Sequence, residues 1–420
     1  MAKYLVEKSG PLRGEVEISG AKNSVLPILA ATLLADGPCE IRDVPALRDV
    51  DVMCKLLRQL GCKVSEDFRK KIVTVEPPAA LQNEAAEELA IRMRASILAM
   101  GPLLAKTGRA KFPLPGGCAI GARPVDLHCK GFEAMGATVE LGDDYVEARA
   151  RKLVGGKVYL DFPSVGATEN IMMAAALADG ISTIENAAEE PEIIDLANFL
   201  NKMGAKIKGA GTATIRIEGV PTLHGCGHTV IPDRIETGTF MLAAAITGGD
   251  VLIRNVIPDH VRAVIAKLLE CGVSIEDTDE GMRVRGDVKP LVATNIKTMP
   301  YPGFPTDLQS PFMTLLAVAK GHSVVTETVF EDRFKHIGEL NRMGAEIRIN
   351  DRKASVEGGQ PLHGAKVMAT DLRAGAALVL AGFMAEGVTE VGAIHLVERG
   401  YEDFVEKLTA LGGKIRRVEE

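Results

Sequence analysis

The sequence has 420 residues, enough for two or three domains, and its 46% hydrophobic and 25% charged residues are typical of a soluble globular protein. Its net charge of −7 argues against a general nucleic-acid binder, which would need a basic face. Seven scattered cysteines without a C-x-x-C pair, an N-terminus without an apolar signal segment, and no apolar run long enough to cross a bilayer predict a cytoplasmic protein with neither a disulfide framework nor a membrane partner.

The first part of the chain predicts one structural unit in which strand-like and helix-like patterns alternate. In order, we expect a strand at 15–19, a helix at 22–35, a strand at 39–44, an amphipathic helix at 49–60 and two short strands at 63–65 and 72–75. The unit is therefore β-α-β-α-β-β. Alternation of the two periods indicates a mixed α/β architecture.

A short phrase centred on glycine marks six copies of this unit. The phrase is a bulky residue or cysteine, then glycine, then two residues and a Val or Ile, and its glycines are Gly61, Gly136, Gly204, Gly272, Gly344 and Gly412. Repeats at a near-constant period indicate a repeated fold. We expect each glycine to end the second helix of its unit in the left-handed conformation, which is readily adopted only by glycine.

The first helix of several units is almost free of charge. The stretches 174–178, 241–246 and 374–381 are aliphatic throughout, which predicts helices buried on all sides. No terminal unit has the polar character of a solenoid cap, so we expect two closed globes of three units each.

Charged residues recur at the same places in the units. Near the start of the first helices lie Lys22, Arg94, Arg234, Asp307 and Arg373, and ahead of the second helices lie Arg48, Arg123, Arg333 and Arg399. A single arginine at a helix start is usually a solvated surface charge. Their common register instead predicts one anion-binding cleft lined from both globes.

The stretch from Pro115 to Pro124 predicts a ligand-covering loop. It contains three glycines, the thiol of Cys118 and the guanidinium of Arg123. Glycines let the backbone approach a ligand closely, and arginine binds anions through a planar fork of donors. We expect the loop to cover an anionic small molecule and present sulfur to it.

Three polar residues have two readings each. Asp307 is either a helix cap or first-turn residue, the favoured reading when it is taken alone, or a general base. Asn23 is either a cap or a ligand contact. Asp371 either caps a helix beside a surface Arg373 or forms an ion pair that turns this arginine toward a phosphate.

Other kinds of site are not predicted. His224, Cys226 and His228 are of residue types that bind metals, but no fourth ligand is near them in sequence. A P-loop, a dinucleotide-binding glycine motif and a G-x-S-x-G elbow are missing from the sequence.

With these residues collected, the chain resembles the enolpyruvyl transferase family, and within it the UDP-N-acetylglucosamine 1-carboxyvinyltransferases, along its whole length. The motifs are 20–23 (GAKN), 93–96 (MRAS), the Cys118 loop through 126–128 (DLH), 304–307 (FPTD), 326–334 (TETVFEDRF), 371–373 (DLR) and 399–401 (RGY). The resemblance implies a two-domain inside-out α/β barrel with three β-α-β-α-β-β units per domain. One domain would span 22–231 with the Cys118 loop, and the other 1–21 plus 232–420, completed by the N-terminal strand. The active site would lie in a cleft between them that closes on substrate.

The resemblance also implies a reaction. The enolpyruvyl group of phosphoenolpyruvate would move to the 3-hydroxyl of UDP-N-acetylglucosamine with release of phosphate, as the first committed step of peptidoglycan synthesis, without a metal or organic cofactor. Cys118 would deliver a proton or aid product release and can bond to phosphoenolpyruvate, and Asp307 would take the proton of the sugar hydroxyl.

Further roles follow from the same resemblance. Phosphoenolpyruvate would be held by Lys22, Asn23, Arg123, Arg373 and Arg399. The sugar nucleotide would be contacted by Asn23, Arg94, Arg123, Pro124, Val125, Asp126, Leu127, Phe162, Pro163, Ser164, Val165, Asp307 and Val329. Arg333, Asp371 and Glu331 would support these groups.

Two alternatives stay open. A 5-enolpyruvylshikimate-3-phosphate synthase shares the six-unit plan but lacks the cysteine loop. A non-catalytic sugar-nucleotide-binding protein would be expected to lose Cys118, Asp307 or Lys22, and all three are present.

Overall fold

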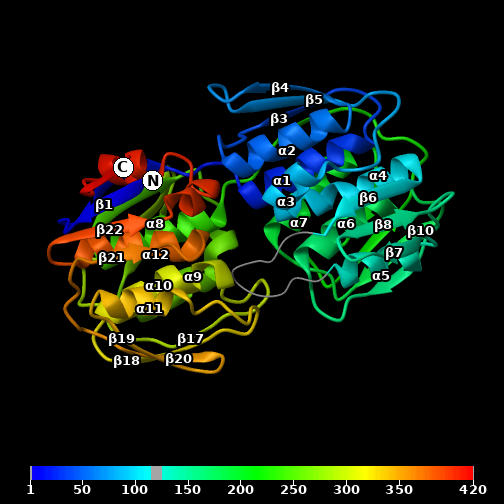
Figure 1. The fold of residues 1–420 in the computed structure, drawn as a ribbon. Helices are drawn as coiled ribbons and strands as arrows, with labels where there is room; N and C mark the ends of the chain where they lie inside the picture. Colours follow the sequence, from blue (N-terminus) through cyan, green and yellow to red (C-terminus); the bar gives the residue numbers. More distant parts are fainter. Residues whose placement is uncertain (1, 115–124, 420) are drawn as a thin grey trace. The chain divides into compact units, whose positions relative to one another are not determined.

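The structure, a computed structural model, describes residues 2–114 and 125–419. The chain forms two compact units with mixed helices and strands (Figure 1). Unit I comprises residues 20–114 and 125–231, and unit II comprises residues 2–19 and 232–419. Each unit has its own hydrophobic core.

Unit I contains three sheets among its described residues, with strand orders β13-β3-β5-β4, β6-β8-β7 and β11-β12-β10-β9. Its elements are α1 (Lys22–Ala31), η1 (Thr32–Leu34), β3 (Cys39–Arg42), α2 (Arg48–Gln59), β4 (Lys63–Asp67), β5 (Ile72–Glu76), α3 (Glu87–Arg92), η2 (Arg94–Ala99), α4 (Met100–Thr107), β6 (Arg109–Pro113), α5 (Asp126–Ala134), β7 (Thr138–Leu141), β8 (Tyr145–Arg149), β9 (Lys157–Tyr159), α6 (Val165–Ala175), β10 (Ile181–Glu185), α7 (Pro191–Lys202), β11 (Lys206–Lys208), β12 (Thr214–Glu218) and β13 (Gly227–Thr229).

Unit II contains three four-stranded sheets in its described part, with orders β15-β16-β14-β2, β17-β18-β20-β19 and β21-β22-β1-β23. Its elements are β1 (Lys3–Glu7), β2 (Arg13–Glu17), α8 (Arg234–Ile246), β14 (Asp250–Arg254), η3 (Pro258–Val261), α9 (Arg262–Glu270), β15 (Ser274–Thr278), β16 (Gly281–Arg285), β17 (Ile296–Lys297), η4 (Thr306–Leu308), α10 (Gln309–Val318), β18 (His322–Thr326), α11 (His336–Arg342), β19 (Glu346–Asn350), β20 (Lys353–Glu357), β21 (Lys366–Met368), α12 (Leu372–Met384), β22 (Val388–Gly392), η5 (Ile394–Arg399), α13 (Phe404–Ala410) and β23 (Ile415–Val418).

The four-stranded sheets share one topology. In the sheet of β9 to β12, β9 runs parallel to β10, and β12 pairs antiparallel with both β10 and β11. In the last sheet β1 takes the place that β12 has here, pairing antiparallel with β22 and β23. The N-terminal strand therefore completes the sixth repeat, as the resemblance implies.

Two strands lie in a different unit from the helix that follows them. β2 precedes α1 in the chain but pairs with β14 of unit II, while β13 precedes α8 but pairs with β3 of unit I. The chain thus passes between units after residue 19 and after residue 231. Near these points Asp233 N donates to Ser19 O at 2.9 Å, and Ala21 N donates to Ile231 O at 2.8 Å.

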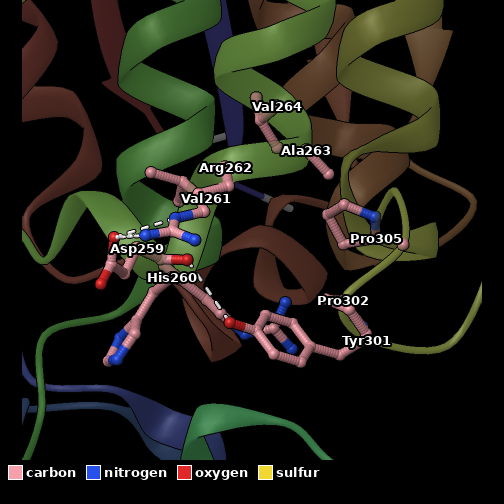
Figure 2. Close-up of a pocket in the computed structure, with 11 residues that line it drawn as sticks. Asp259, His260, Val261, Arg262, Ala263, Val264, Tyr301, Pro302 and Pro305 are labelled. Atoms are coloured by element: carbon pink, nitrogen blue, oxygen red, sulfur yellow. Dashed lines mark hydrogen bonds and ion pairs between the residues drawn. The ribbon is translucent and has the colours of Figure 1, made fainter.

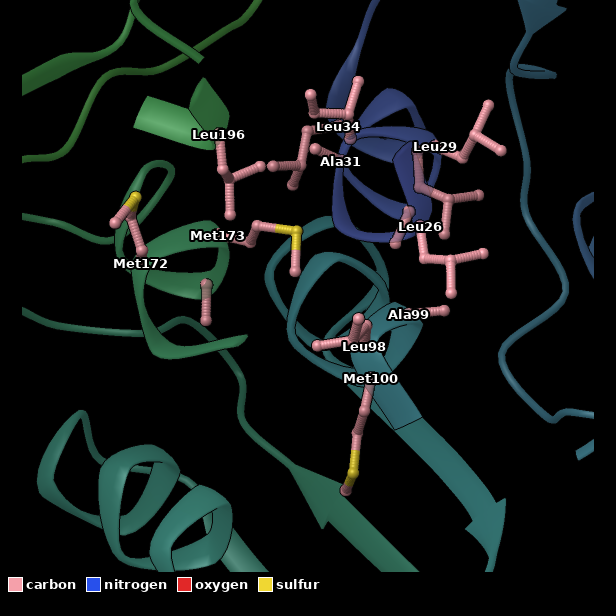
Figure 3. Close-up of a cluster of buried hydrophobic side chains, with 14 of the residues drawn as sticks. Leu26, Leu29, Ala31, Leu34, Leu98, Ala99, Met100, Met172, Met173 and Leu196 are labelled. Atoms are coloured by element: carbon pink, nitrogen blue, oxygen red, sulfur yellow. The ribbon is translucent and has the colours of Figure 1, made fainter. Parts of the chain in front are cut away.

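The first helix of most repeats is buried on every side, as predicted. Every residue of α8 after Arg234 is buried, and so is every residue of α12 from Arg373 to Phe383. Figure 3 shows the equivalent core of unit I, where Leu26 and Leu29 of α1, Met100 of α4 and Met173 of α6 meet aliphatic neighbours. These first helices therefore lie inside each unit.

The six repeat glycines all have left-handed backbone conformations, with φ of 105°, 87°, 105°, 94°, 99° and 93° in chain order. After α2, Gly61 N donates to Arg58 O at 3.0 Å and Cys62 N to Leu57 O at 2.9 Å. The same two hydrogen bonds recur after the five other second helices. This is the Schellman arrangement, so the prediction that these glycines end helices is confirmed.

Some predicted boundaries were wrong by a few residues. The helix expected at 22–35 is α-helical only to Ala31 and then tightens into the 3₁₀ turn of η1, a common ending for an α-helix. The strand expected at 15–19 is β2, at Arg13–Glu17. Among residues 2–114 and 125–419, every helix is too short or too polar to traverse a lipid bilayer.

Candidate functional site

The helix starts hold the charged residues that the sequence placed there. Lys22, Arg94 and Arg234 are the first residues of α1, η2 and α8. Asp307 lies in η4, directly ahead of α10, and Arg373 is the second residue of α12. Cys118, Arg123 and Pro124 lie outside the described residues.

In unit II, Asp307 lies between two arginines. Arg333 Nη1 is 2.9 Å from Asp307 Oδ1, and Arg373 donates from Nε and Nη2 to Asp307 Oδ2 at 3.2 Å each. The side chains of Arg333 and Arg373 are 4% and 2% exposed, while that of Asp307 is 27% exposed. One carboxylate thus offers an accessible edge while two buried cations fix its orientation.

Arg373 also rests against a buried aromatic ring. Its guanidinium carbon lies 5.2 Å from the ring centre of Tyr401, whose hydroxyl is 2.9 Å from Thr239 Oγ1. Burial opposes the charge of Arg373, but Tyr401, Asp307 and Asp233 more than offset this, so the pKa of Arg373 is raised and the group stays charged. Within the described residues, Arg373 Nη1 is buried without a hydrogen-bond partner.

Asp371 and Asp307 occupy different positions at the starts of their helices. Asp371 caps α12, because its Oδ1 accepts from the backbone N of Arg373 and of Ala374 at 2.8 and 3.0 Å. The arginine beside it is buried rather than on the surface, and it forms an ion pair with Asp307. Asp307 is the acidic residue in the first turn of η4, whose cap position is held by Pro305, so it matches the first-turn reading rather than the cap reading.

Two residues of this region were missed at the sequence level. Tyr401 supports Arg373, and the buried Glu327 accepts hydrogen bonds from the segments before Asp307 and around Val329. Both lie within motifs that carried the resemblance. Tyr401 ends the motif that begins with Arg399, and Glu327 lies two residues before Val329. Their motif membership was the only signal available.

Three more residues of unit II were predicted to belong to the site. Val329 donates its backbone N to Glu327 Oε1 at 2.8 Å. Arg399 is the last residue of η5 and is half-buried. Glu331 is exposed and pairs with Arg352 at 3.5 Å.

In unit I, the start of α1 carries a buried ion pair. Lys22 Nζ is 3.4 Å from Asp49 Oδ2, and the two side chains are 12% and 6% exposed. Asn23, the next residue, is half-buried. A lysine held this way by a carboxylate from α2 has its ammonium group anchored at the helix start.

Close to Arg94 lies a buried histidine with a defined tautomer. Asn170 Oδ1 accepts from Gly101 N at 2.6 Å and its Nδ2 donates to Ile97 O, so the same Nδ2 must donate to His128 Nδ1 at 3.0 Å. Burial, and secondly the charge of Arg94, lower the pKa of His128 to about 4. His128 is therefore neutral at pH 7, with its proton on Nε2.

The other predicted sugar-nucleotide contacts of unit I fall at two helix starts. Val125 and Leu127 flank Asp126, the exposed first residue of α5. Phe162 is exposed, Pro163 and Val165 are half-buried, and Ser164 caps α6 by accepting from Ala167 N at 3.3 Å.

The run from His224 to His228, which leads into β13, contains no cluster of candidate metal ligands in the described part of the chain. His228 Nδ1 accepts from Lys202 Nζ at 3.2 Å, so its Nε2 donates to Asp195 Oδ1 at 2.8 Å, and His224 is exposed. Nowhere in the described chain do three or more His, Cys, Asp or Glu side chains gather in a way that could hold a metal ion.

A cavity of about 220 Å³ lies beside the segment that leads to Asp307 (Figure 2). It is lined by Arg234, by Tyr301 to Gly303 and Pro305, and by residues 259–264. The guanidinium carbon of Arg234 is 5.7 Å from the ring centre of Tyr301, and Arg262 forms an ion pair with Asp259 at 2.7 Å. The arginine singled out by the repeat register thus faces a hollow next to Asp307's segment.

Comparison with known proteins identifies a family whose model matches most of the chain. The profile of EPSP synthase (3-phosphoshikimate 1-carboxyvinyltransferase) matches residues 6–408. UDP-N-acetylglucosamine 1-carboxyvinyltransferase 1 of Caldanaerobacter subterraneus subsp. tengcongensis is 63% identical over 415 residues, 99% of each chain. UDP-N-acetylglucosamine 1-carboxyvinyltransferase 2 of Carboxydothermus hydrogenoformans is 60% identical over the whole of both chains.

Solved structures agree in fold. The enolpyruvyl transferase NikO from Streptomyces tendae superposes with a TM-score of 0.88 at 28% identity, over 99% of each chain. EPSP synthase from Acinetobacter baumannii gives 0.78 at 18% identity over the whole of both chains. The predicted fold class is thereby confirmed.

Proposed function

The chain belongs to the EPSP synthase family of enolpyruvyl (1-carboxyvinyl) transferases, and we propose that it transfers the enolpyruvyl group of phosphoenolpyruvate to the 3-hydroxyl of UDP-N-acetylglucosamine. The structural observation that carries this proposal is the Asp307 carboxylate held by Arg333 and Arg373. The choice of acceptor is supported by the names of the relatives at 63% and 60% identity. In this role the enzyme carries out the first committed step of peptidoglycan synthesis in the cytoplasm.

The proposed reaction is an addition followed by an elimination. The sugar oxygen bonds to C2 of phosphoenolpyruvate and loses its proton to Asp307, while the methylene carbon C3 gains a proton. The tetrahedral adduct then loses phosphate from C2 and a proton from C3, which restores the double bond. Cys118 delivers the proton to C3 or aids product release.

Asp307 fits the role of base because its position is fixed. Two guanidinium groups occupy defined sides of its oxygens, yet more than a quarter of the side chain is exposed. A general base must be held within hydrogen-bond reach of the proton that it removes. The pair of arginines provides this orientation without further movement of the carboxylate.

Anion binding is supported by cations at helix starts of both units. Arg373 keeps a buried Nη1 that an oxygen of phosphoenolpyruvate is suited to satisfy, since an unpaired buried donor costs about 1–3 kcal/mol. Lys22 and Arg399 are proposed as further contacts to the phosphate and carboxylate, and Arg123, Asn23 and Arg94 as additional binding residues. Fixed cations of this kind stabilise charge that develops in a transition state.

Phosphate release tests the acceptor directly. We expect the purified protein to release phosphate from phosphoenolpyruvate only when UDP-N-acetylglucosamine is present. Turnover with shikimate 3-phosphate in its place would reassign the protein to the other branch of the family. Absence of turnover with both acceptors, together with binding of the sugar nucleotide, would indicate a non-catalytic binding protein.

The role of Cys118 is tested separately. We expect Cys118→Ser to fold normally and lose most activity, and we expect the epoxide phosphonate fosfomycin to add to Cys118. Peptide mass spectrometry locates the adduct. An adduct on a different cysteine would remove Cys118 from the mechanism, and Cys129→Ser is a control at a half-buried thiol.

A further inference from the structure

We propose that Glu327 is a positioning residue that sets the geometry of Asp307 and Arg333 through the hydroxyl of Thr306. The inference rests on the proposed role of Asp307 as the base. Glu327 itself lies away from solvent, with 1% of its surface exposed, and so acts on the reaction through its neighbours.

The carboxylate of Glu327 is fully engaged. Oε1 accepts from Thr298 Oγ1 at 2.7 Å, from Val329 N at 2.8 Å and from Phe330 N at 3.2 Å. Oε2 accepts from Thr306 Oγ1 at 2.9 Å. A buried carboxylate with four donors is stably held, whereas one without them would be costly to bury.

These four hydrogen bonds join three segments at the end of one sheet. Thr298 directly follows β17, Thr306 directly precedes Asp307, and Val329 and Phe330 begin the turn that leads to Arg333. Glu327 itself follows β18, which pairs with β17 (Figure 1). One side chain therefore ties the base, a predicted sugar-nucleotide contact and the path to Arg333 to a rigid sheet end.

Thr306 connects Glu327 to the charged group. A hydroxyl has one hydrogen, and Thr306 gives it to Glu327, so its oxygen is left to accept. Arg333 Nη1 donates to that oxygen at 3.4 Å while lying 2.9 Å from Asp307 Oδ1. The direction of the Thr306 hydroxyl thus decides whether Arg333 meets a lone pair or a hydrogen at this point.

An amide in place of the carboxylate reverses that direction. Three donors converge on Oε1, so Glu327→Gln must place its oxygen there and its NH2 group opposite Thr306. The NH2 group then donates to Thr306, whose hydroxyl hydrogen turns away toward Arg333 and repels it. The variant keeps the shape of the side chain but disturbs the position of Arg333, which orients Asp307.

The experiment compares four single variants by steady-state kinetics with both substrates and by melting temperature. Glu327→Gln and Thr306→Val are expected to lower kcat by about 10- to 100-fold with little change in either KM, the size of effect that a small misplacement produces. Thr306→Ser, which keeps the hydroxyl, is expected to stay within about threefold of the wild type. Thr314→Val is the matched control, because Thr314 is a buried threonine of the same unit whose hydroxyl, among the residues that the structure describes, bonds to backbone oxygens alone.

The double variant gives a second readout. Since both changes break one connection, Glu327→Gln with Thr306→Val should cost no more in kcat than the worse single variant. The proposal is overturned if Thr306→Ser is as slow as Thr306→Val, if the losses follow melting temperature as in Thr314→Val, or if the two losses multiply.

A crystal structure of Thr306→Val separates this inference from the proposed function. Displacement of Arg333 Nη1 from Asp307 Oδ1 supports the positioning role even if the acceptor proves to be a different one. An unchanged contact overturns the positioning role even if UDP-N-acetylglucosamine is turned over.

Discussion

His128 is a buried histidine whose tautomer is set by a single neighbour. Asn170 presents a donor to its Nδ1, so a proton on that nitrogen would face an N–H group. The lowered pKa of about 4 has the same direction as this geometry, with burial as its main cause. His336 in unit II is also fully buried, and burial lowers its pKa to about 4, with Arg333 lowering it and Asp371 raising it.

These histidines predict an acid-sensitive fold. In the unfolded chain a histidine takes up its proton near pH 6.5, but the folded protein resists protonation of these two until about pH 4. The unfolded state therefore binds more protons between these values, and the free energy of unfolding falls as pH falls through this window, by about 1.4 kcal/mol per pH unit for each group.

Urea unfolding at pH 7.5, 6, 5 and 4.5 measures this slope. We expect His128→Asn, whose Oδ1 replaces the acceptor Nδ1, to reduce this slope by about 1.4 kcal/mol per pH unit, the contribution of one titrating group. A slope identical to that of the wild type would contradict the assignment of His128 as a group that charges on unfolding.

The sequence predicted the positions of the charged residues better than it predicted which residues they contact. The repeat register placed Asp307 and Arg373 at helix starts, but the two are 66 positions apart and their pairing depends on how α10 and α12 pack. Local sequence made a cap the favoured reading of Asp307, since cap chemistry is local. Glu327 and Tyr401 were missed because no characteristic sequence spacing marks a buried side chain that acts by supporting another.

Among the elements, the helix-ending glycines give a prediction with a built-in comparison. Gly412 and Gly344 have φ of 93° and 99°, but a Cβ at Gly412 meets nothing within 4 Å, whereas one at Gly344 comes within 2.9 Å of His363 Nδ1 and 3.0 Å of Pro361 O. We expect Gly412→Ala to cost only the backbone strain, about 1 kcal/mol of unfolding free energy. Gly344→Ala should cost clearly more.

Chemical denaturation of the two variants tests this difference. Gly412→Asn is the control, because asparagine tolerates the left-handed conformation better than alanine. Equal losses for Gly412→Ala and Gly344→Ala would mean that the surroundings of Gly344 relax freely.

Element types were predictable because each rests on a local signal. Helical spacing and the glycine after the second helix fixed α2, and alternation fixed β3 and β5. The strand pairing of β2 and β13 was not predictable, because each pairs with a strand more than 150 residues away in the chain. No local sequence pattern indicates that these two strands pair with such distant partners.

For the whole molecule, β1 predicts a loss of stability confined to one unit. Removing residues 2–9 leaves β22 and β23 without the strand between them and takes the buried side chains of Tyr4 and Val6 out of the core of unit II. We expect hydrogen exchange, followed by mass spectrometry, to accelerate throughout unit II while the peptides of unit I keep their protection.

A deletion of the C-terminal residues 419–420 is the control, since β23 ends at Val418. Loss of protection in unit I as well would show that the two units do not unfold independently.

The place of β1 also orders events during synthesis on the ribosome. Its neighbours, β22 and β23, are translated last, so the earliest strand to leave the exit tunnel is among the last to be paired. Residues 20–231 carry every strand of the unit I sheets and emerge as one uninterrupted stretch. Domains generally fold as units while the chain is being made. Unit I can therefore mature while translation continues, and the apolar residues of β1 stay open to chaperones until the final codons have been read.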